Sequence, residues 1–381
     1  MRPSAKKLLT ALAVTSLLTI PAACGASQDE STDLALVVAV DQTVEELNPL
    51  TSFFAVNDDV NALVYTPLIR WSAEDFNPQP GLATSWEPSK DQLTWTYTIR
   101  DDVTWSDGEP VTAADAEFTY RLLMDDPELR AANTELIDNF TSVEATDDTT
   151  LVITIKKPSS QMTALDRPIV PEHIWSHIDK PAEYANTDFP LVGSGPFQVT
   201  DFKVDEYIKL TANQDYFEGA PRYHELVFQY YKTPDAAVQA LRSGDIDLVG
   251  SLNPAQYASL RDADGITTNS APNRRFISVT FNVGAKAQDG TAIGDGHPAL
   301  RDPVVRQAMH QAVDKDELVT KIEDGQAEPG VSLIPPIYAD YFWDPGDQLV
   351  DFDIDAANAS LDDAGYTRDD DGVRTMPDNG K

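Results

Sequence analysis

The sequence predicts a mixed α/β fold, because the spacing of strands and the start signals of helices recur along the chain. Between Leu93 and Ile99, apolar side chains alternate with threonines, as in a strand that buries one face. Soon afterwards Thr112 can cap a helix, with Asp115 three positions later as an acidic variant of the capping box. With 381 residues, 41% of them hydrophobic, the chain is long enough for two or more globular domains.

The N-terminus predicts export from the cytoplasm. Basic residues precede an apolar run at 8–20, which is too short to span a bilayer stably, so 1–23 is expected to be a signal peptide rather than a retained membrane helix. Cys24 is the only cysteine, which excludes an internal disulfide. It stands where a lipoprotein carries its acyl chains, although Pro21 replaces the usual leucine. We expect a lipid anchor at Cys24, followed by a polar tether over 24–35.

The first elements after the tether are short strands and one amphipathic helix. The apolar run 34–40 predicts a buried first strand, and alternation over 151–155 predicts another strand with one buried face. The helix that begins after the capping box is expected to carry Ala114, Phe118 and Leu122 on its apolar face.

Helix and strand signals continue to the end of the chain. Thr233 caps a helix that has proline in its first turn, and Gly244 ends that helix. The further expected elements are, in order, a strand from 245, a strand at 274–282, a helix after Asp302, a helix with a capping box from Asp314 to Glu317, and a hairpin-like turn at 369–374.

The segment Gly81–Leu123 carries a long composite pattern. It reads Leu-Ala-x-Ser-Trp-Glu, a strand, Arg-x-Asp-Val-x-Trp-Ser-Asp-Gly, and Thr-Ala-x-Asp. This pattern resembles the family 5 solute-binding proteins of ABC importers, the group of the oligopeptide, dipeptide and nickel binders. The resemblance extends from about residue 36 to the end of the sequence. Further segments that resemble the family are Leu-Asn-Pro at 47–49, Gly-Ser-Gly-Pro-Phe at 193–197, Leu-Arg-Ser-Gly-Asp-Ile-Asp at 241–247 and Val-Arg-Gln-Ala at 305–308.

The resemblance implies a two-lobe, periplasmic-binding-protein-like fold with an extra small domain. Lobe I would comprise 36–70 and 188–283, with the accessory α/β domain inserted at 71–187. Residues 284–381 would form part of lobe II. Family members usually continue well beyond this length, so we expect a truncated chain with an incomplete second lobe.

The implied function is that of an extracytoplasmic substrate-binding subunit. It would be a monomer, held by its lipid anchor in the periplasm or on the outer face of the cytoplasmic membrane. It would capture a di- or oligopeptide between its lobes and deliver it to a permease driven by a separate ATPase. Nickel chelates, sugars and other small solutes remain open as ligands, and a secreted hydrolase is the alternative from another class. The formal charge of 28 − 63 = −35 argues against nucleic acid as a partner.

In a two-lobe binder, strand ends and lobe-crossing segments line the ligand cleft. The candidate ligand contacts chosen on this ground are Thr51, Phe53, Phe54, Asn57, Ser194, Gly195, Arg274 and Arg275. Trp343 is a further candidate, because it could stack on a ligand or, alternatively, fill lobe II. The arginine guanidinium groups would suit a peptide carboxylate, whereas the aromatic residues could equally be core residues. In the family, the acid that holds a peptide's amino terminus lies late in lobe II, beyond this chain.

Motifs for catalysis and for cofactors are missing from the sequence. His173 and His177 are four residues apart but have no third metal ligand nearby, and 369–372 lacks the glutamate of a calcium loop. No nucleophile elbow, Walker sequence or dinucleotide fingerprint occurs. The sequence therefore predicts a binding protein with no catalytic residue, metal or cofactor.

Overall fold

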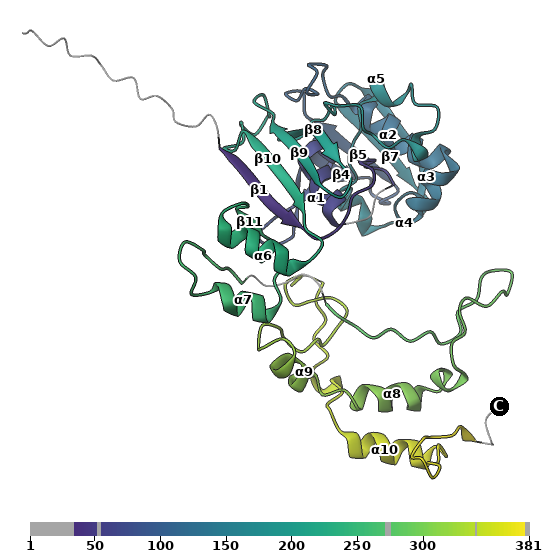
Figure 1. The fold of residues 1–381 in the computed structure, drawn as a ribbon. Coiled ribbons are helices and arrows are strands. Elements are labelled where there is room, and N and C mark those ends of the chain that lie inside the picture. Colours follow the sequence, from purple (N-terminus) through teal and green to yellow (C-terminus); the bar gives the residue numbers. More distant parts are fainter. Residues whose placement is uncertain (1–33, 52–54, 271–275, 340, 378–381) are drawn as a thin grey trace, which may run out of the picture.

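The computed structural model describes residues 34–51, 55–270, 276–339 and 341–377, and contains two large sheets (Figure 1). The first sheet has five strands in the order β11-β1-β10-β9-β8. Its strands are β1 (Ala35–Val40), β8 (Phe197–Lys203), β9 (Tyr207–Ala212), β10 (Glu225–Tyr230) and β11 (Leu248–Val249). β1 runs parallel to both β10 and β11, whereas β9 is antiparallel to its two neighbours. The expected first strand is thus present in the interior of the sheet, but its side chains are half-buried or exposed rather than buried.

The second sheet is antiparallel, with four strands in the order β4-β5-β7-β6. They are β4 (Ala83–Pro88), β5 (Thr94–Ile99), β6 (Phe140–Asp147) and β7 (Thr150–Ile155). Trp95, Tyr97 and Ile99 of β5 are buried, and so are alternate residues of β7, which confirms both predicted alternations. The helix α2 (Ala113–Asp125) packs on β6 and β7. A small hairpin of β2 (Ile69–Trp71) and β3 (Pro78–Pro80) lies before this sheet in sequence.

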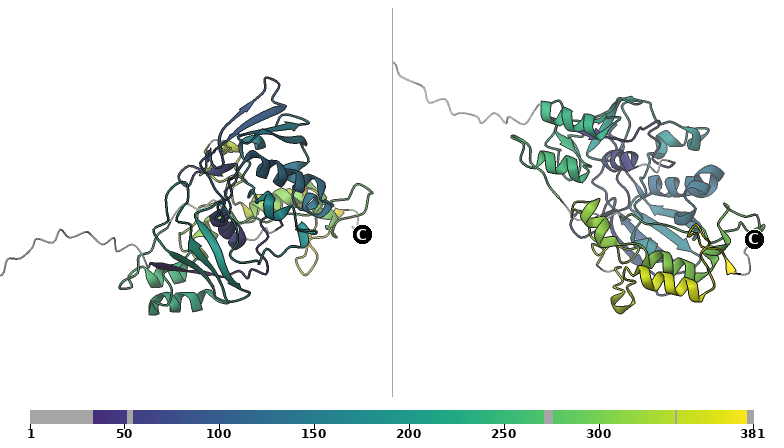
Figure 2. Two further views of the ribbon diagram at one scale, coloured as in Figure 1. Left: turned by 90° about the horizontal axis from the view of Figure 1, so that it is seen from above. Right: turned by 60° about the horizontal axis from the view of Figure 1, so that its bottom comes forward.

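The remaining elements are helices and 3-10 turns. Those before residue 270 are α1 (Ala55–Val64), α3 (Pro127–Ala132), α4 (Thr134–Ile137), η1 (Ser160–Thr163), α5 (Glu172–Trp175), η2 (Pro181–Glu183), α6 (Pro234–Ser243) and α7 (Pro254–Leu260). Those after it are η3 (Pro298–Arg301), α8 (Pro303–Gln311), α9 (Lys315–Lys321), η4 (Gly346–Gln348) and α10 (Ile354–Asp363). Figure 1 shows α8 and α10 away from both sheets, and the right-hand view of Figure 2 shows these two helices side by side. No helix in the described part of the chain is long and apolar enough to cross a membrane.

Packing differs along the chain, and we call 34–270 the N-terminal body and 276–377 the C-terminal region. One core cluster extends from Val44 to Phe228 and joins the two sheets. The described hydrophobic residues of the C-terminal region that are buried are Ala308, Ala357 and Tyr366, at the contact of α8 and α10. The N-terminal body is therefore the part that carries a large core.

The predicted apolar face of α2 was wrong by about one residue. The helix buries Ala113, Ala116, Tyr120 and Leu123, whereas the predicted Ala114, Phe118 and Leu122 are half-buried at its edge. Apolar residues occupy two neighbouring stripes of this helix, and contact with β6 selects the stripe that faces the sheet.

The strand predicted at 274–282 does not form over its described residues, 276–282. Ile277 is 96% exposed and Val279 is 78% exposed, so the alternating apolar side chains have no sheet to cover. Alternation specifies which side chains share a face, but a strand also needs a neighbour, and the described residues provide none here. The strand predicted from 245 shortens to β11 for the same reason, because only Leu248 and Val249 pair with β1.

Candidate functional site

The parallel part of the first sheet gives the fold a natural binding edge. In open α/β sheets, ligands bind outside the carboxyl ends of the parallel strands. At this edge β1 leads into the loop before α1, β10 leads to Thr233 at the start of α6, and β11 leads to Asn253 at the start of α7. The loop after β1 and the starts of these helices therefore form the candidate site.

Buried asparagine side chains fix the loop after β1. Asn48 donates through Nδ2 to two carbonyl oxygens near η2, at 2.8 and 2.9 Å, and its Oδ1 accepts from the Leu50 amide at 2.9 Å. Asn133 donates to the Leu50 carbonyl and Asn186 to the Leu47 carbonyl, both at 2.9 Å. These residues are at most 3% exposed, so the bonds are shielded from water. The loop is thus held by hydrogen bonds to Asn133 and to the segment 181–186.

Thr51 and Asn57, both predicted ligand contacts, lie at the two ends of the next segment. The Thr51 hydroxyl donates to a Glu46 carboxylate oxygen at 3.1 Å, and Asn57 Nδ2 donates to the Glu46 carbonyl at 2.7 Å. Asn57 is 2% exposed, and its Oδ1 has no partner among the described residues. The predicted contacts Phe53 and Phe54 lie outside the described residues.

A group of charged residues lies beside this loop, and the sequence analysis did not single it out. Asp58 and Asp59 are in the first turns of α1, and the Asp166 carboxylate accepts a hydrogen bond from Trp71 Nε1 at 2.9 Å. Partial desolvation raises the pKa of Asp58 above its ordinary value; the positive charge of Arg167 opposes this shift, and Asp59 and Asp166 add to it. The group therefore places two further carboxylates and one guanidinium within electrostatic reach of Asp58. In the sequence, this group is marked by a pair of acidic residues at a helix start. Acidic residues are so numerous in this chain that such a pair does not indicate a binding site by itself.

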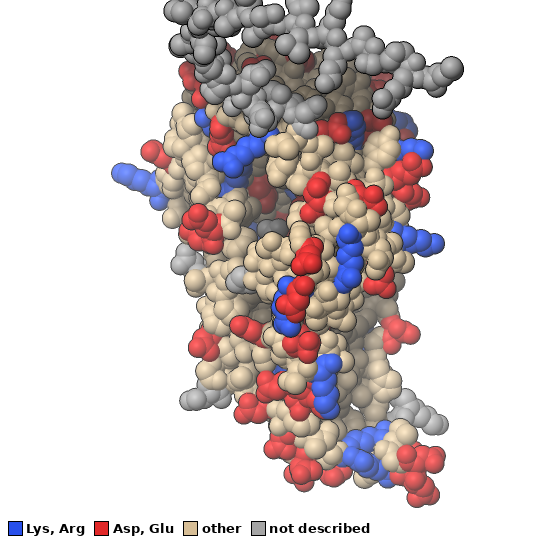
Figure 3. Space-filling view, turned by 60° about the vertical axis from the view of Figure 1, so that its left-hand side comes forward, with Lys and Arg blue, Asp and Glu red and all other residues tan. Residues whose placement is uncertain are grey.

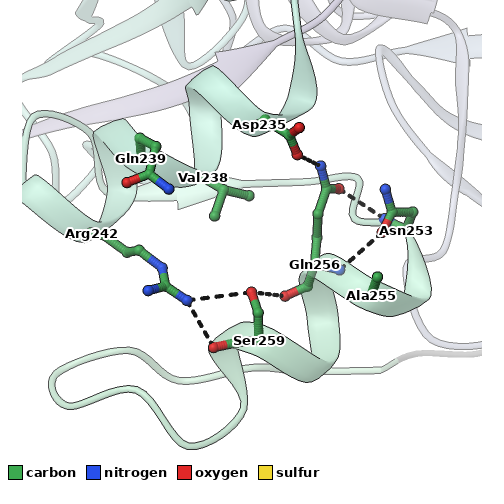
Figure 4. A pocket seen from close by; sticks show the side chains of 8 residues that line it. All are labelled: Asp235, Val238, Gln239, Arg242, Asn253, Ala255, Gln256 and Ser259. Carbon is green, nitrogen blue, oxygen red and sulfur yellow. Dashed lines mark hydrogen bonds between the residues drawn. The ribbon is translucent and has the colours of Figure 1, made fainter.

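A groove of about 490 Å³ separates α6 from α7 (Figure 4). Its polar side chains bind one another across the groove. Gln256 donates through Nε2 to Asp235 at 2.7 Å, and Arg242 donates through Nη2 to the Ser259 carbonyl at 2.9 Å. These bonds hold the two helices together and use the polar groups that line the groove.

Ser194 and Gly195 are buried against the C-terminal end of α1. The Ser194 hydroxyl accepts from the Thr66 amide at 3.0 Å, and the Gly195 amide donates to the Val64 carbonyl at 2.9 Å. A Cβ at Gly195 would lie 2.2 Å from the Leu63 carbonyl oxygen, so the glycine permits close approach of two backbones. Their polar atoms are used within the protein, and a ligand contact would have to replace these bonds.

The other predicted site residues are spread over the chain. Trp343 is 57% exposed in the C-terminal region, where it is open to a ligand or to another surface. Arg274, Arg275 and Cys24 lie outside the described residues.

His173 and His177, the pair with the spacing of metal ligands, have no third ligand beside them among the described residues. His173 Nε2 lies 2.8 Å from an Asp107 oxygen, and His177 follows the end of α5. Among the described residues, no group of three or more potential ligands could hold a metal ion. The acidic segment at 369–372 forms a tight turn, in which the Gly372 amide donates to the Asp369 carbonyl at 3.0 Å.

Known proteins show similarity over most of the chain. The family model described as bacterial extracellular solute-binding proteins, family 5 Middle, matches residues 77–381. The nickel-binding periplasmic protein of Escherichia coli (strain K12) is 30% identical over 318 residues, which are 80% of this chain and 56% of that protein. The chain spans little more than half the length of the curated relatives it matches, 55% and 61% in two of them.

Solved structures share the fold. NikZ from Campylobacter jejuni, in complex with Ni(L-His), has a TM-score of 0.76 at 24% identity, covering 91% of this chain and 66% of NikZ. The oligopeptide-binding protein AppA from Bacillus subtilis, in complex with a nonapeptide, has a TM-score of 0.71 at 24% identity, covering 92% of this chain and 68% of AppA. These neighbours are two-lobe periplasmic binding proteins, and the predicted fold class is confirmed.

Proposed function

Because this chain belongs to the bacterial extracellular solute-binding proteins of family 5, we propose that it captures a small solute and delivers it to the permease of an ABC importer. The family is one of binding proteins, and the mechanism needs no covalent chemistry. The solute would bind between the lobes and stabilise their closed arrangement over the open one. The permease would then recognise the closed arrangement.

The ligand class best supported is a peptide with free termini. Such a peptide carries an ammonium group and a carboxylate group. The group beside α1 offers both complements, since Asp58, Asp59 and Asp166 suit the ammonium and Arg167 suits the carboxylate. Thr51 lies next to this group along the chain, and its hydroxyl would add a polar contact. The mixed charge of this group is the observation that carries the proposal.

A metal–amino acid chelate is the second candidate. One relative in this family is the nickel-binding protein of Escherichia coli, and NikZ holds nickel together with histidine. The acidic excess of the same group would also attract a chelate of positive charge.

We also propose the cellular setting that the sequence predicts. The segment 1–23 would direct export, Cys24 would carry the lipid anchor, and the protein would act as a monomer outside the cytoplasm. Figure 3 shows acidic side chains spread over one face rather than gathered in a single patch. The formal charge of −35 would repel the phosphates of nucleic acid.

Thermal unfolding in the presence of defined ligands tests the ligand class. We expect trialanine to raise Tm, whereas trialanine that is N-acetylated or C-amidated should raise it less, because each block removes one charge. Nickel alone and nickel with L-histidine serve as the competing probes. A shift with nickel and histidine, and none with any peptide, would replace the peptide proposal by the chelate.

Variants of the charged group test the site. Asp58→Asn and Arg167→Gln should each weaken trialanine binding about 10- to 100-fold, as expected for the loss of a charge-assisted hydrogen bond. Asp101→Asn, an exposed carboxylate in a turn elsewhere, is the matched control. Because the pKa of Asp58 is raised, this carboxylate protonates earlier than an ordinary one as the pH falls, and wild-type affinity should decline in that range. Calorimetric titration that finds equal affinities for all three variants would exclude this site.

A further inference from the structure

The turn between β2 and β3 holds an aromatic side chain in an unusual backbone conformation. The hairpin is closed by the Ser72 amide, which donates to the Asn77 carbonyl at 2.9 Å, and by the Phe76 amide, which donates to the Ser72 carbonyl at 3.2 Å. At the tip, Phe76 has a φ of 58°, in the left-handed region that bulky residues rarely adopt. Such a conformation persists where the surrounding structure enforces it, and it is frequent in clamps and switches.

This conformation places Phe76 against the C-terminal region. Its ring centroid lies 5.3 Å from that of Tyr338, with the ring planes tilted by 49°. This separation is within the range of favourable aromatic pairs. A turn also presents the partner ring, because the Tyr338 carbonyl accepts from the amides of Tyr341 and Phe342, at 2.9 and 2.8 Å. Both rings are half-buried, as is expected of a contact between two surfaces.

The contact joins two parts of the molecule that otherwise pack sparingly. Among the described elements, no helix or strand of the C-terminal region packs extensively on one of the N-terminal body. Figure 1 shows α8, α9 and α10 set apart from both sheets. A single ring pair can therefore have a measurable influence on how closely the two parts approach.

We propose that Phe76 and Tyr338 form an interlobe latch that favours the observed arrangement, in which the tip of the β2–β3 hairpin touches the turn of Tyr338. The proposal rests on the proposed function in one respect, since a latch matters to a protein whose lobes close on a solute. When the two parts move apart, the ring pair separates. An aromatic pair changes such an equilibrium by a factor of about 2 to 10. The latch thus sets how readily the two parts leave this arrangement, which a bound solute must also influence.

Distance measurements on the unliganded full chain test the latch. Spin labels would be attached at Lys90→Cys and Glu328→Cys, two exposed positions in the two parts, with Cys24→Ser removing the native thiol. We expect Phe76→Ala and Tyr338→Ala each to increase the population at longer distances by about 2- to 10-fold. Alanine has a Cβ, so the backbone at position 76 stays strained at positive φ, whereas glycine would relieve that strain. Phe76→Ala therefore removes the ring and changes the turn less than Phe76→Gly would.

The double variant and a neighbouring aromatic residue provide the controls. If the two rings act through each other, Phe76→Ala combined with Tyr338→Ala should do no more than either change alone. Tyr341→Ala, which removes a 55% exposed ring from the same turn, should leave the distances unchanged. Unchanged distances in both single variants, additive effects in the double variant, or an equal effect of Tyr341→Ala would each overturn the latch. Tyr338→Ala leaves the hairpin intact, so it remains informative if Phe76→Ala perturbs folding.

The outcomes separate the latch from the proposed function. Peptide binding with unchanged distances would retain the function and remove the latch. Altered distances in a protein that binds none of the peptides would retain the latch and remove the peptide proposal.

Discussion

The N-terminal body and the C-terminal region use the same helix-start signals but differ in packing. In the body, Thr233 accepts from the Ala236 amide at the start of α6. In the C-terminal region, Asp302, Asp314 and Asp353 accept equivalent bonds at the starts of α8, α9 and α10. Yet the core cluster that joins the two sheets lies entirely in the body, and many large hydrophobic side chains of the C-terminal region are exposed.

This difference shows that local signals and core formation are separate requirements. A capping bond joins residues two or three positions apart, so it forms wherever the helix forms. A core needs apolar side chains from segments that are distant in sequence. The segment 276–282 has the alternation of a strand but no sheet neighbour among the described residues, and it forms no strand. Helices can thus be present in a region whose long-range packing is slight.

The largest expected effect comes from the same substitution made in a helix of each region. Leu123 of α2 is fully buried, whereas Leu318 of α9 is 49% exposed. Leu123→Ala should lower the free energy of unfolding by about 2–5 kcal/mol, because it removes apolar contacts and leaves a cavity. Leu318→Ala should cost less than about 1 kcal/mol. Urea unfolding followed by tryptophan fluorescence measures both, and equal costs would show that the two regions are packed alike.

A smaller effect is expected at the close approach beside α1. Gly195→Ala would bring a Cβ to 2.2 Å from the Leu63 carbonyl oxygen, so the backbones must separate. We expect a cost of about 1–3 kcal/mol, as for other overpacked sites. Gly330→Ala in the C-terminal region is the matched control, since nothing lies within 4 Å of the added methyl group. Thermal unfolding that leaves Gly195→Ala as stable as Gly330→Ala would argue that α1 and the 193–197 segment are loosely joined.

Much of the fold was predictable because its signals are local. The alternation of β5 and β7, the cap and glycine end of α6, and the start of α8 were each confirmed at or near the expected residues. The buried face of α2 was not, because the sequence offers two apolar stripes and the sheet selects one. Nor was the state of 276–282, which depends on a neighbour rather than on its own residues.

The candidate site was harder to predict, because its residues are far apart in sequence. Asn133 and Asn186 hold the loop around Leu47 and Leu50, but neither stands in a pattern that indicates a partner so distant. The charged group likewise joins Asp58 of α1 to Arg167, which the fold alone brings within reach. The choice of strand ends as cleft residues did select Thr51 and Asn57, at the loop where that group lies. Whether they contact a ligand stays a prediction.

The smallest effect concerns the cap of α8, where the C-terminal region has local order of its own. Asp302 accepts from the Val304 amide through Oδ1 and from the Tyr366 hydroxyl through Oδ2, both at 2.9 Å, so it links the start of α8 to the segment after α10. Asp302→Ala should cost about 1 kcal/mol and increase amide hydrogen exchange in α8 and α10. Tyr366→Phe removes one of the two bonds and should cost less. Because the region has little packing on the N-terminal body, protection in α6 should not change. Equal loss of protection in α6 would show that the two regions unfold together, and that the contrast between them is one of packing density rather than of cooperativity.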